Sequence, residues 1–293
     1  MTSNDLLNLF KKNPLSFHHN SKSMIILGDA IENLSKIKDN QFNLIFADPP
    51  YNIGKIFGNS KENFSKNEYI TWCKIWIDEC FRVLKNNGVL CFMTSTQAMP
   101  YLDCYVDEKY HVVSRIIWYY DSSGVQAKKN FGSMYEPILI VSKDKKNYVF
   151  NTDDIMVEAK TGAVRKLMDY RKTPPQPYNT KKVPGNVWEL PRIRFKMDEY
   201  ETHPTQKPEK LLERIILTFS NKHDLVLDPF AGTFTTCAVS KKLERNTVGI
   251  EMEEEYYKIG LRRLNLVDTF NGKKLVKDKR RVTKNKSKKD HAT

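Results

Sequence analysis

The stretch Phe42-Asn43-Leu44-Ile45-Phe46-Ala47-Asp48-Pro49-Pro50-Tyr51 decides the fold of this chain. Its first six residues form a short apolar run, which is typical of a buried strand. The next four residues place a carboxylate, two prolines and an aromatic ring directly after that strand. Because ligands of parallel α/β sheets bind at the carboxyl ends of the strands, this stretch predicts both a sheet and a functional site.

Strand-like runs and helix-like segments alternate along much of the chain. The other short apolar runs cover residues 24–27, 89–93, 112–119, 137–141, 225–227 and 248–250. Apolar residues at helical spacing fill the intervals, and one helix is expected to open at Pro208, a residue suited to the first helical turn. The alternation predicts an α/β fold with a mostly parallel central sheet. A proline-rich stretch, at about residues 151–201, interrupts it and predicts a loop-rich insert rather than a layer of sheet.

Positive charge is concentrated in two windows of the sequence. The chain has 48 Lys and Arg residues against 35 Asp and Glu, a net charge of +13. Residues 160–196 carry ten basic residues against two acidic ones, and residues 273–289 carry ten against one. The second window has few apolar residues, which predicts a flexible basic tail. Such windows indicate a polyanionic partner or an anionic membrane surface.

Several classes of protein are disfavoured by what the sequence lacks. No apolar run approaches the roughly 18 residues of a membrane-spanning helix, and residues 1–13 lack the pattern of a secretory signal. The five cysteines include no Cys-x-x-Cys pair, and the six histidines show no metal-ligand spacing. We therefore expect a cytoplasmic protein without a membrane partner, a disulfide framework or a metal site.

Residues 48–51, here called the amine motif, are suited to hold an amino group. The prolines fix the backbone and remove donors, which leaves the Asp48 carboxylate and the Pro49 carbonyl as acceptors beside the Tyr51 ring. Two acceptors can bind both N–H groups of an amine on a flat base while the aromatic ring stacks on that base. Taken alone, the same tetrapeptide also fits a tight turn capped by Asp48.

A second strand end has the features of a nucleoside site. The strand at 224–227 is followed by Asp228-Pro229-Phe230-Ala231-Gly232-Thr233-Phe234-Thr235-Thr236 and then by a helix, whose first N–H groups a ligand can approach. Glu251 ends the next strand, 19 positions after Gly232, and that spacing suits a carboxylate that binds ribose hydroxyls. The Gly-x-Gly-x-x-Gly fingerprint is absent, which favours a nucleoside without phosphates over a dinucleotide.

These segments, together with His203-Pro204-Thr205-Gln206-Lys207-Pro208, resemble the motif set of amino-methylating DNA methyltransferases that use S-adenosylmethionine. The amine motif precedes residues 228–236, the cofactor motif, as in the circularly permuted β class of that family. The likeness runs from about residue 24 to residue 264. Segments 121–129, 135–137 and 174–179 resemble the YhdJ-type adenine methyltransferases of bacteria. The resemblance implies a Rossmann-like methyltransferase fold and a base that is flipped out of the duplex.

The resemblance divides the chain into three parts. Residues 1–22 are an N-terminal extension, residues 23–268 are the catalytic domain with its recognition insert, and residues 269–293 are the basic tail. At the amine motif, Asp48 and Pro49 with Pro50 would hold the target amino group, and Tyr51 would stack on the flipped base.

The resemblance also implies contacts with S-adenosylmethionine. Glu251 would bind the ribose, and Asp29 would contact the cofactor base, with a helix N-cap role for Asp29 as the alternative. Lys207, with two threonines of the cofactor motif, would meet the methionine carboxylate. The expected contacts within the cofactor motif are Asp228, Phe230, Ala231, Gly232, Thr233, Thr235 and Thr236.

Two positions leave details of the cofactor site open. Phe234 stands where many members of the family have a second glycine, so a bulky ring is expected beside the cofactor loop. His203 either orients that loop or holds a structural turn, and the sequence does not decide between these roles.

Adenine N6 is the favoured target. A carbon-5 cytosine methyltransferase needs a thiolate, normally after a proline, and the chain has no Pro-Cys pair. Asp at position 48 is more usual for adenine N6, whereas Ser is more usual for cytosine N4, which stays the alternative. Relatives that act on RNA or on a protein amide usually have Asn there. A catalytically silent DNA-binding protein on the same scaffold is the second class, and the intact Asp48, Tyr51 and Glu251 argue against it.

The insert is the predicted contact with double-stranded DNA, because basic and aromatic residues interleave in it. Its side chains would read base edges in a groove, and contact with phosphates alone is the alternative. A DNA substrate implies a nucleoid-associated protein. The sequence leaves open a homodimer and a companion restriction endonuclease. The candidate DNA-binding residues are Arg165, Arg171, Lys172, Arg192 and Arg194.

Overall fold

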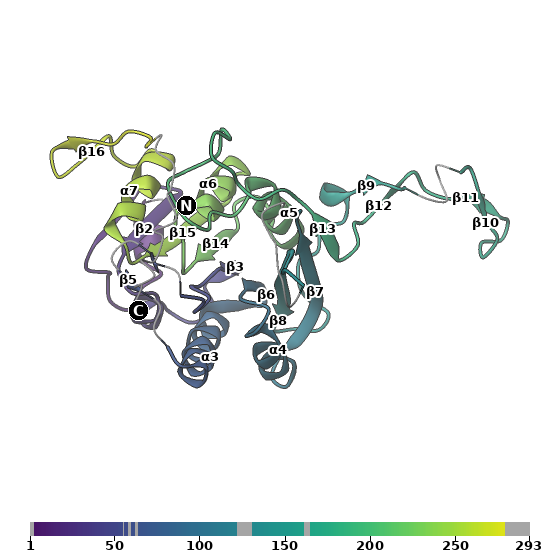
Figure 1. The fold of residues 1–293 in the computed structure, drawn as a ribbon, viewed down its shortest axis with the longest axis horizontal. Coiled ribbons are helices and arrows are strands. Elements are labelled where there is room, and N and C mark those ends of the chain that lie inside the picture. Colours follow the sequence, from purple (N-terminus) through teal and green to yellow (C-terminus); the bar gives the residue numbers. More distant parts are fainter. Residues whose placement is uncertain are drawn as a thin grey trace, which may run out of the picture.

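A nine-stranded sheet forms the centre of the computed structural model, which describes residues 3–54, 56–57, 60–61, 64–121, 131–160 and 165–278 (Figure 1). The run from β2 to β6 in the sheet is parallel, whereas β1 and β8 are antiparallel to their neighbours. The predicted α/β fold is confirmed. Across the sheet the order is β1 (Phe17–His19), β2 (Ser23–Leu27), β15 (Asn246–Glu251), β14 (Leu225–Asp228), β3 (Phe42–Ala47), β6 (Leu84–Met93), β8 (Tyr135–Ser142), β7 (His111–Tyr119) and β13 (Val187–Glu189).

Each apolar run predicted from the sequence lies within one of these strands. Strand β3 shows the reason. Leu44 and Phe46 pack into one apolar cluster, while Ile45 and Ala47 pack into another on the opposite face. Because both faces are buried, the strand is a continuous apolar run rather than an alternating one.

Helices cover both faces of the sheet, which gives three layers (Figure 1). One face packs against α1 (Ser3–Leu7), α2 (Ala30–Lys36), α3 (Lys66–Val83) and α4 (Met99–Asp107). The other packs against α5 (Glu209–Phe219), α6 (Thr235–Lys242) and α7 (Glu254–Arg263). Pro208 is the N-cap of α5 rather than a residue of its first turn, so the predicted start is one residue early. In the described part of the chain, no helix has the length and apolar character needed to cross a membrane.

The insert forms an arm that projects from the body (Figure 1). It begins with η1 (Asp153–Ile155), and its paired strands are β9 (Val157–Glu158) with β12 (Lys181–Lys182) and β10 (Met168–Asp169) with β11 (Gln176–Pro177). The prediction that the insert adds no layer of sheet is wrong for β13, which is a parallel edge strand beside β7. Trp188 anchors β13, since its side chain is buried and its indole N–H donates to the Gly185 carbonyl at 2.9 Å.

Both ends of the described chain pack against the body. In the segment predicted as an N-terminal extension, β1 pairs with β2, and Leu6 and Phe10 are buried. In the segment predicted as a flexible tail, β16 (Thr269–Phe270) and β17 (Lys273–Lys274) form a hairpin, and Phe270 packs on the cluster around Tyr257. The remainder of the predicted tail, residues 279–293, lies outside the described residues, as does most of segment 121–129. After the amine motif, β4 (Ile56–Phe57) pairs with β5 (Ser60–Lys61).

Candidate active site

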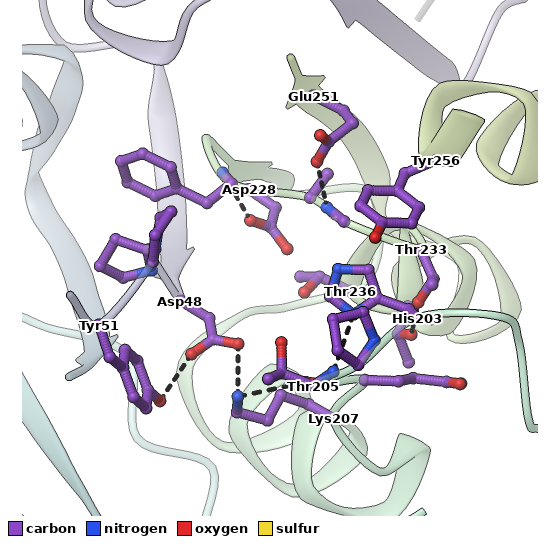
Figure 2. A pocket seen from close by; sticks show the side chains of 18 of the residues that line it. Asp48, Tyr51, His203, Thr205, Lys207, Asp228, Thr233, Thr236, Glu251 and Tyr256 are labelled. Atoms are coloured by element: carbon purple, nitrogen blue, oxygen red, sulfur yellow. Dashed lines mark hydrogen bonds and ion pairs between the residues drawn. The ribbon is translucent and has the colours of Figure 1, made fainter. Parts of the chain in front are cut away.

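A cavity of about 520 Å³ opens at the carboxyl ends of β2, β3, β14 and β15 (Figure 2). The amine motif lines one part of it, and the cofactor motif with Glu251 lines another. This volume falls within the roughly 300–1,000 Å³ that is usual for small-molecule sites. The topology therefore brings two motifs that are far apart in the sequence to one cavity.

Asp48 and Tyr51 are in direct contact at the end of β3. The Tyr51 hydroxyl lies 2.8 Å from Asp48 Oδ1 and 2.9 Å from Glu136 Oε2, so it can donate to either carboxylate. Burial raises the pKa of Tyr51 well above its ordinary value, which keeps the hydroxyl protonated. Helix α3 fixes the amine motif, because the Tyr69 hydroxyl donates to the Pro50 carbonyl at 2.8 Å.

Lys207 is buried beside the amine motif. Its Nζ lies 2.6 Å from Asp48 Oδ2 and 3.5 Å from Glu136 Oε2 (Figure 2 shows the pair with Asp48). Burial alone would lower the pKa of Lys207, but the two carboxylates raise it to about 12, so the ammonium is charged at neutral pH. Burial raises the pKa of Asp48, and Lys207 opposes that shift. The contact of Lys207 with a methionine carboxylate stays a prediction.

Glu136 is a site residue that the sequence reasoning missed. It lies on β8, and besides Tyr51 and Lys207 its carboxylate accepts from the Tyr120 hydroxyl at 3.1 Å. The guanidinium of Arg192 lies 4.6 Å from the centroid of the Tyr120 ring, which links the amine motif to the insert. The available signal was the resemblance of segment 135–137 to the family, but no role at the site followed from it, because the partners of Glu136 are distant in sequence.

Glu251 and Asp228 form the opposite part of the cavity. The Glu251 carboxylate accepts from the backbone N–H groups of Gly232 at 2.7 Å and Glu253 at 2.8 Å. Asp228 accepts from the Phe230 N–H at 3.0 Å. Burial raises the pKa of both Asp228 and Glu251 to about 7. The carboxylate of Glu251 has further lone pairs that can accept from ligand hydroxyls.

Phe230 and Asp29 flank the same region. The Phe230 ring lies 5.7 Å from Trp72 and 5.4 Å from Trp76, measured between ring centroids, and forms an apolar wall. Asp29 lines the cavity and also caps α2, where its side chain accepts from the Glu32 N–H at 2.8 Å. The N-cap alternative is therefore confirmed, and the contact of Asp29 with a cofactor base stays a prediction.

The first turn of α6 closes this part of the cavity. Arg263 of α7 donates to the Thr233 carbonyl at 3.0 Å and to the Thr235 hydroxyl at 2.8 Å, which fixes the turn. All the residues predicted to bind the cofactor line the cavity, namely Asp29, Lys207, Asp228, Phe230, Ala231, Gly232, Thr233, Thr235, Thr236 and Glu251.

Phe234 stands where many members of the family have a glycine. Its φ of 58° is left-handed, a conformation that glycine adopts without strain. The ring lies in the core, where it is fully buried in one cluster with Ala231 of the cofactor motif and Tyr257, so it is beside the loop as expected but does not line the cavity. Two glycines make room for it, since a Cβ atom built on Gly249 would lie 2.8 Å from Cδ1 and one on Gly260 2.7 Å from Cγ of the ring.

His203 contacts both the turn and the cofactor loop. The Thr205 N–H donates to its Nδ1 at 3.2 Å, and its ring packs edge-on against Tyr256 with the centroids 4.4 Å apart. A Cβ atom at Gly232 would lie 3.2 Å from His203 Nε2. Both roles predicted for His203 therefore have a structural basis.

The candidate DNA-binding residues fall into two groups. Arg192 and Arg194 line the cavity, whereas Arg165, Arg171 and Lys172 are exposed on the arm. Arg171 forms an ion pair with Asp169, with Nε 2.8 Å from Oδ1 and Nη2 3.0 Å from Oδ2. Among the described residues, no group of three or more His, Cys, Asp or Glu side chains is placed to hold a metal ion.

Comparison with known proteins decides the family. A family model described as DNA methylase matches residues 42–262, a span that contains both motifs. The chain belongs to the DNA methylase family. This methylase is 56% identical, over 94% of its own length and 93% of the relative, to DNA adenine methyltransferase YhdJ of Escherichia coli (strain K12). It is 34% identical, over 85% of its length and 75% of the relative, to the type II methyltransferase M.HpaI of Haemophilus parainfluenzae. These matches confirm the resemblance of the sequence to amino-methylating DNA methyltransferases.

Solved structures are similar to this methylase over most of its length. The M1.HpyAVI-SAM complex is 26% identical, covers 83% of this chain and all of the other, and has a TM-score of 0.58. The cytosine-N4-specific PvuII DNA methyltransferase is 18% identical, with 90% and 91% of the two chains covered and a TM-score of 0.66. The second likeness is one of fold alone.

Proposed function

We propose that this methylase transfers a methyl group from S-adenosylmethionine to the N6 amino group of adenine in double-stranded DNA. The observation that carries the proposal is the cavity that joins the amine motif to Gly232 and Glu251. A methyl donor and an amine must meet in one place, and this cavity contains the expected binding groups for both. Adenine is supported by the relative at 56% identity, which is a DNA adenine methyltransferase.

The residues at the Glu251 end fit a nucleoside cofactor. Glu251 supplies acceptors for ribose hydroxyls, and Phe230 with Trp72 supplies an apolar surface for a base. Gly232, at a φ of 50°, has no side chain between its backbone and the cavity. When bound, S-adenosylmethionine supplies an electrophilic methyl group on a sulfonium, whose positive charge suits the carboxylates of Asp48 and Glu136.

The amine motif aligns the target. Asp48 and the Pro49 carbonyl accept the two N–H bonds of the amino group, while Tyr51 stacks on the base. This directs the nitrogen lone pair towards the methyl group, and alignment of this kind lowers the barrier substantially. Positive charge develops on the nitrogen as its bond to the methyl carbon forms and the bond between that carbon and sulfur breaks, and the Asp48 carboxylate stabilises this charge. The nitrogen releases a proton to water after the transfer. Because the atom is buried in duplex DNA, the base must first be flipped into the cavity.

DNA binding is assigned to three regions with different tasks. The two-stranded arm carries Arg165 and Arg171, and a ribbon of this shape can enter the major groove and read base edges. Arg192 and Arg194 are at the cavity, where the flipped nucleotide would pass. The basic residues of segment 279–293 neutralise phosphates. A DNA substrate agrees with the predicted nucleoid-associated location.

The purified protein should be incubated with unmethylated DNA and S-adenosylmethionine carrying a labelled methyl group. We expect label in N6-methyladenine after hydrolysis to nucleosides, and none with the Asp48→Ala variant. Label in N4-methylcytosine would favour the cytosine alternative, and DNA binding without transfer would favour the silent scaffold. Sequencing of DNA from cells with and without the gene gives the recognition sequence. Sedimentation of the protein tests whether it forms the homodimer that the sequence leaves open, and a companion endonuclease stays open as well.

A further inference from the structure

The ammonium of Lys207 occupies an acceptor that the target amino group needs. Its Nζ lies 2.6 Å from Asp48 Oδ2, while Asp48 Oδ1 contacts the Tyr51 hydroxyl at 2.8 Å. The same Nζ is 5.3 Å from the centroid of the Tyr51 ring, on which the base is expected to stack. Both oxygens of the Asp48 carboxylate are thus engaged by side chains of this chain, and one partner is itself an amine.

Glu136 gives that ammonium a second carboxylate. Glu136 Oε2 lies 3.5 Å from Lys207 Nζ and 2.9 Å from the Tyr51 hydroxyl. The flexible side chain of a lysine can move from one carboxylate to the other without returning its charge to water. The Tyr51 hydroxyl can also turn from Asp48 to Glu136. Both partners of Asp48 therefore have Glu136 as their alternative partner.

We propose that Glu136 is a positioning residue that takes over Lys207 when the target amino group binds Asp48. Before the base arrives, the ammonium of Lys207 occupies the position of the amino group at Asp48. This inference rests on the proposed function. It explains why a third charged side chain is buried at a site that needs one carboxylate for its amine.

The charges support this exchange. Two ionised carboxylates and one ammonium carry a net charge of −1. When Lys207 rests on Glu136, that charge remains on Asp48, where positive charge develops on the amine. Without a carboxylate at position 136, Lys207 has only Asp48 as a partner and competes with the target base. Tyr120 also donates to Glu136, and the guanidinium of Arg192 lies over the Tyr120 ring, so both side chains approach this group of charges from the side of Glu136.

A double-mutant cycle tests the inference. Glu136→Gln keeps the shape of the side chain and removes its charge, so Lys207 stays on Asp48. We expect its turnover to fall about tenfold or more, since hydrogen bonds to charged groups contribute roughly 1.5–3 kcal/mol. Glu136→Gln combined with Lys207→Met restores the net charge of −1 and opens Asp48. The double variant should therefore be several-fold more active than Glu136→Gln alone.

Base flipping gives a second readout. In a duplex with 2-aminopurine beside the adenine that the parent methylates, fluorescence should rise less with Glu136→Gln than with the parent, and should recover with the double variant. Lys207→Met alone leaves two buried carboxylates without their cation and is expected to destabilise the fold. The double variant carries the test, and its turnover is compared with that of Glu136→Gln at saturating S-adenosylmethionine, because Lys207 is also predicted to meet the methionine carboxylate. Circular dichroism at the assay temperature checks that both variants are folded.

Two results would overturn the inference. One is a Glu136→Gln variant whose turnover stays within about threefold of the parent. The other is a double variant that is no more active than Glu136→Gln, as expected if both side chains only support the structure. Failure of the proposed function is a different result, because the parent itself would then transfer no methyl group to adenine.

Discussion

The two ends of the cavity are held by different kinds of contact. At the amine end, the charged side chains of Asp48, Glu136 and Lys207 hold one another. At the cofactor end, Glu251 and Asp228 accept from backbone N–H groups of the surrounding loops. A side chain can change partners by rotating, whereas a backbone donor moves only with its loop. The amine end can therefore rearrange as a DNA base enters and leaves, whereas the cofactor end has its binding groups in place before a ligand binds.

The largest effect is expected from breaking the amine end. Asp48→Ala should lower methyl transfer at least 10²-fold, because it removes an acceptor that is needed most when the amine becomes positive. The affinity for S-adenosylmethionine, measured by calorimetry, should stay within about threefold of the parent. Turnover close to that of the parent would show that another group binds the amine.

Breaking the cofactor end should affect binding instead. Glu251→Ala should weaken the affinity for S-adenosylmethionine about tenfold or more, since hydrogen bonds to a charged group contribute roughly 1.5–3 kcal/mol. Glu251→Gln is the matched control, because it keeps the shape and one acceptor and should weaken binding less. At saturating cofactor, turnover should largely recover. Unchanged affinity in calorimetry would place the ribose elsewhere.

The pH dependence of stability sharpens the comparison. Burial raises the pKa of Glu251 from 4.5 to about 7, so between these values the folded protein binds more protons than the unfolded chain. The stabilisation from protonated Glu251 is present below the unfolded pKa and is lost as the pH rises towards 7, by about 1.4 kcal/mol for each pH unit between the two values. Urea unfolding should show the parent losing stability over this range relative to Glu251→Gln. Parallel curves would contradict the burial of this charge.

Much of the fold follows from local patterns, but part of the site does not. Apolar runs predict the strands because both faces of the central strands are buried. Strand β13 was missed, since its three residues lie between Pro184 and Pro191 and only its pairing with β7 makes it a strand. Glu136 was missed for a similar reason, because its partners Tyr51 and Lys207 come from distant segments. Contacts between distant side chains leave no periodic signal in a single sequence.

The arm and the tail should have the smallest effect on turnover at saturating DNA. Deletion of residues 279–293, which include seven Lys and Arg residues, should weaken cognate and unrelated duplexes by a similar factor. Each lost phosphate contact should flatten the slope of log affinity against log salt by about 0.9. Replacement by Gln of the three exposed basic residues of the arm, Arg165, Arg171 and Lys172, should instead reduce discrimination between the duplexes. Titrations at several salt concentrations check both variants, and a tail deletion that changes the methylated sequence would reverse the assignment.

The packing of the Phe234 ring couples substitutions at Phe234, Gly249 and Gly260. A methyl group added at either glycine meets the ring, and overpacking of this kind costs about 1–3 kcal/mol. Removal of the ring first leaves a void that costs about 3–5 kcal/mol, as for other buried aromatic residues. Each single step is therefore unfavourable, although a combined replacement can be neutral. These three positions are therefore coupled in sequence space, although the Phe234 side chain is not among those that line the cavity.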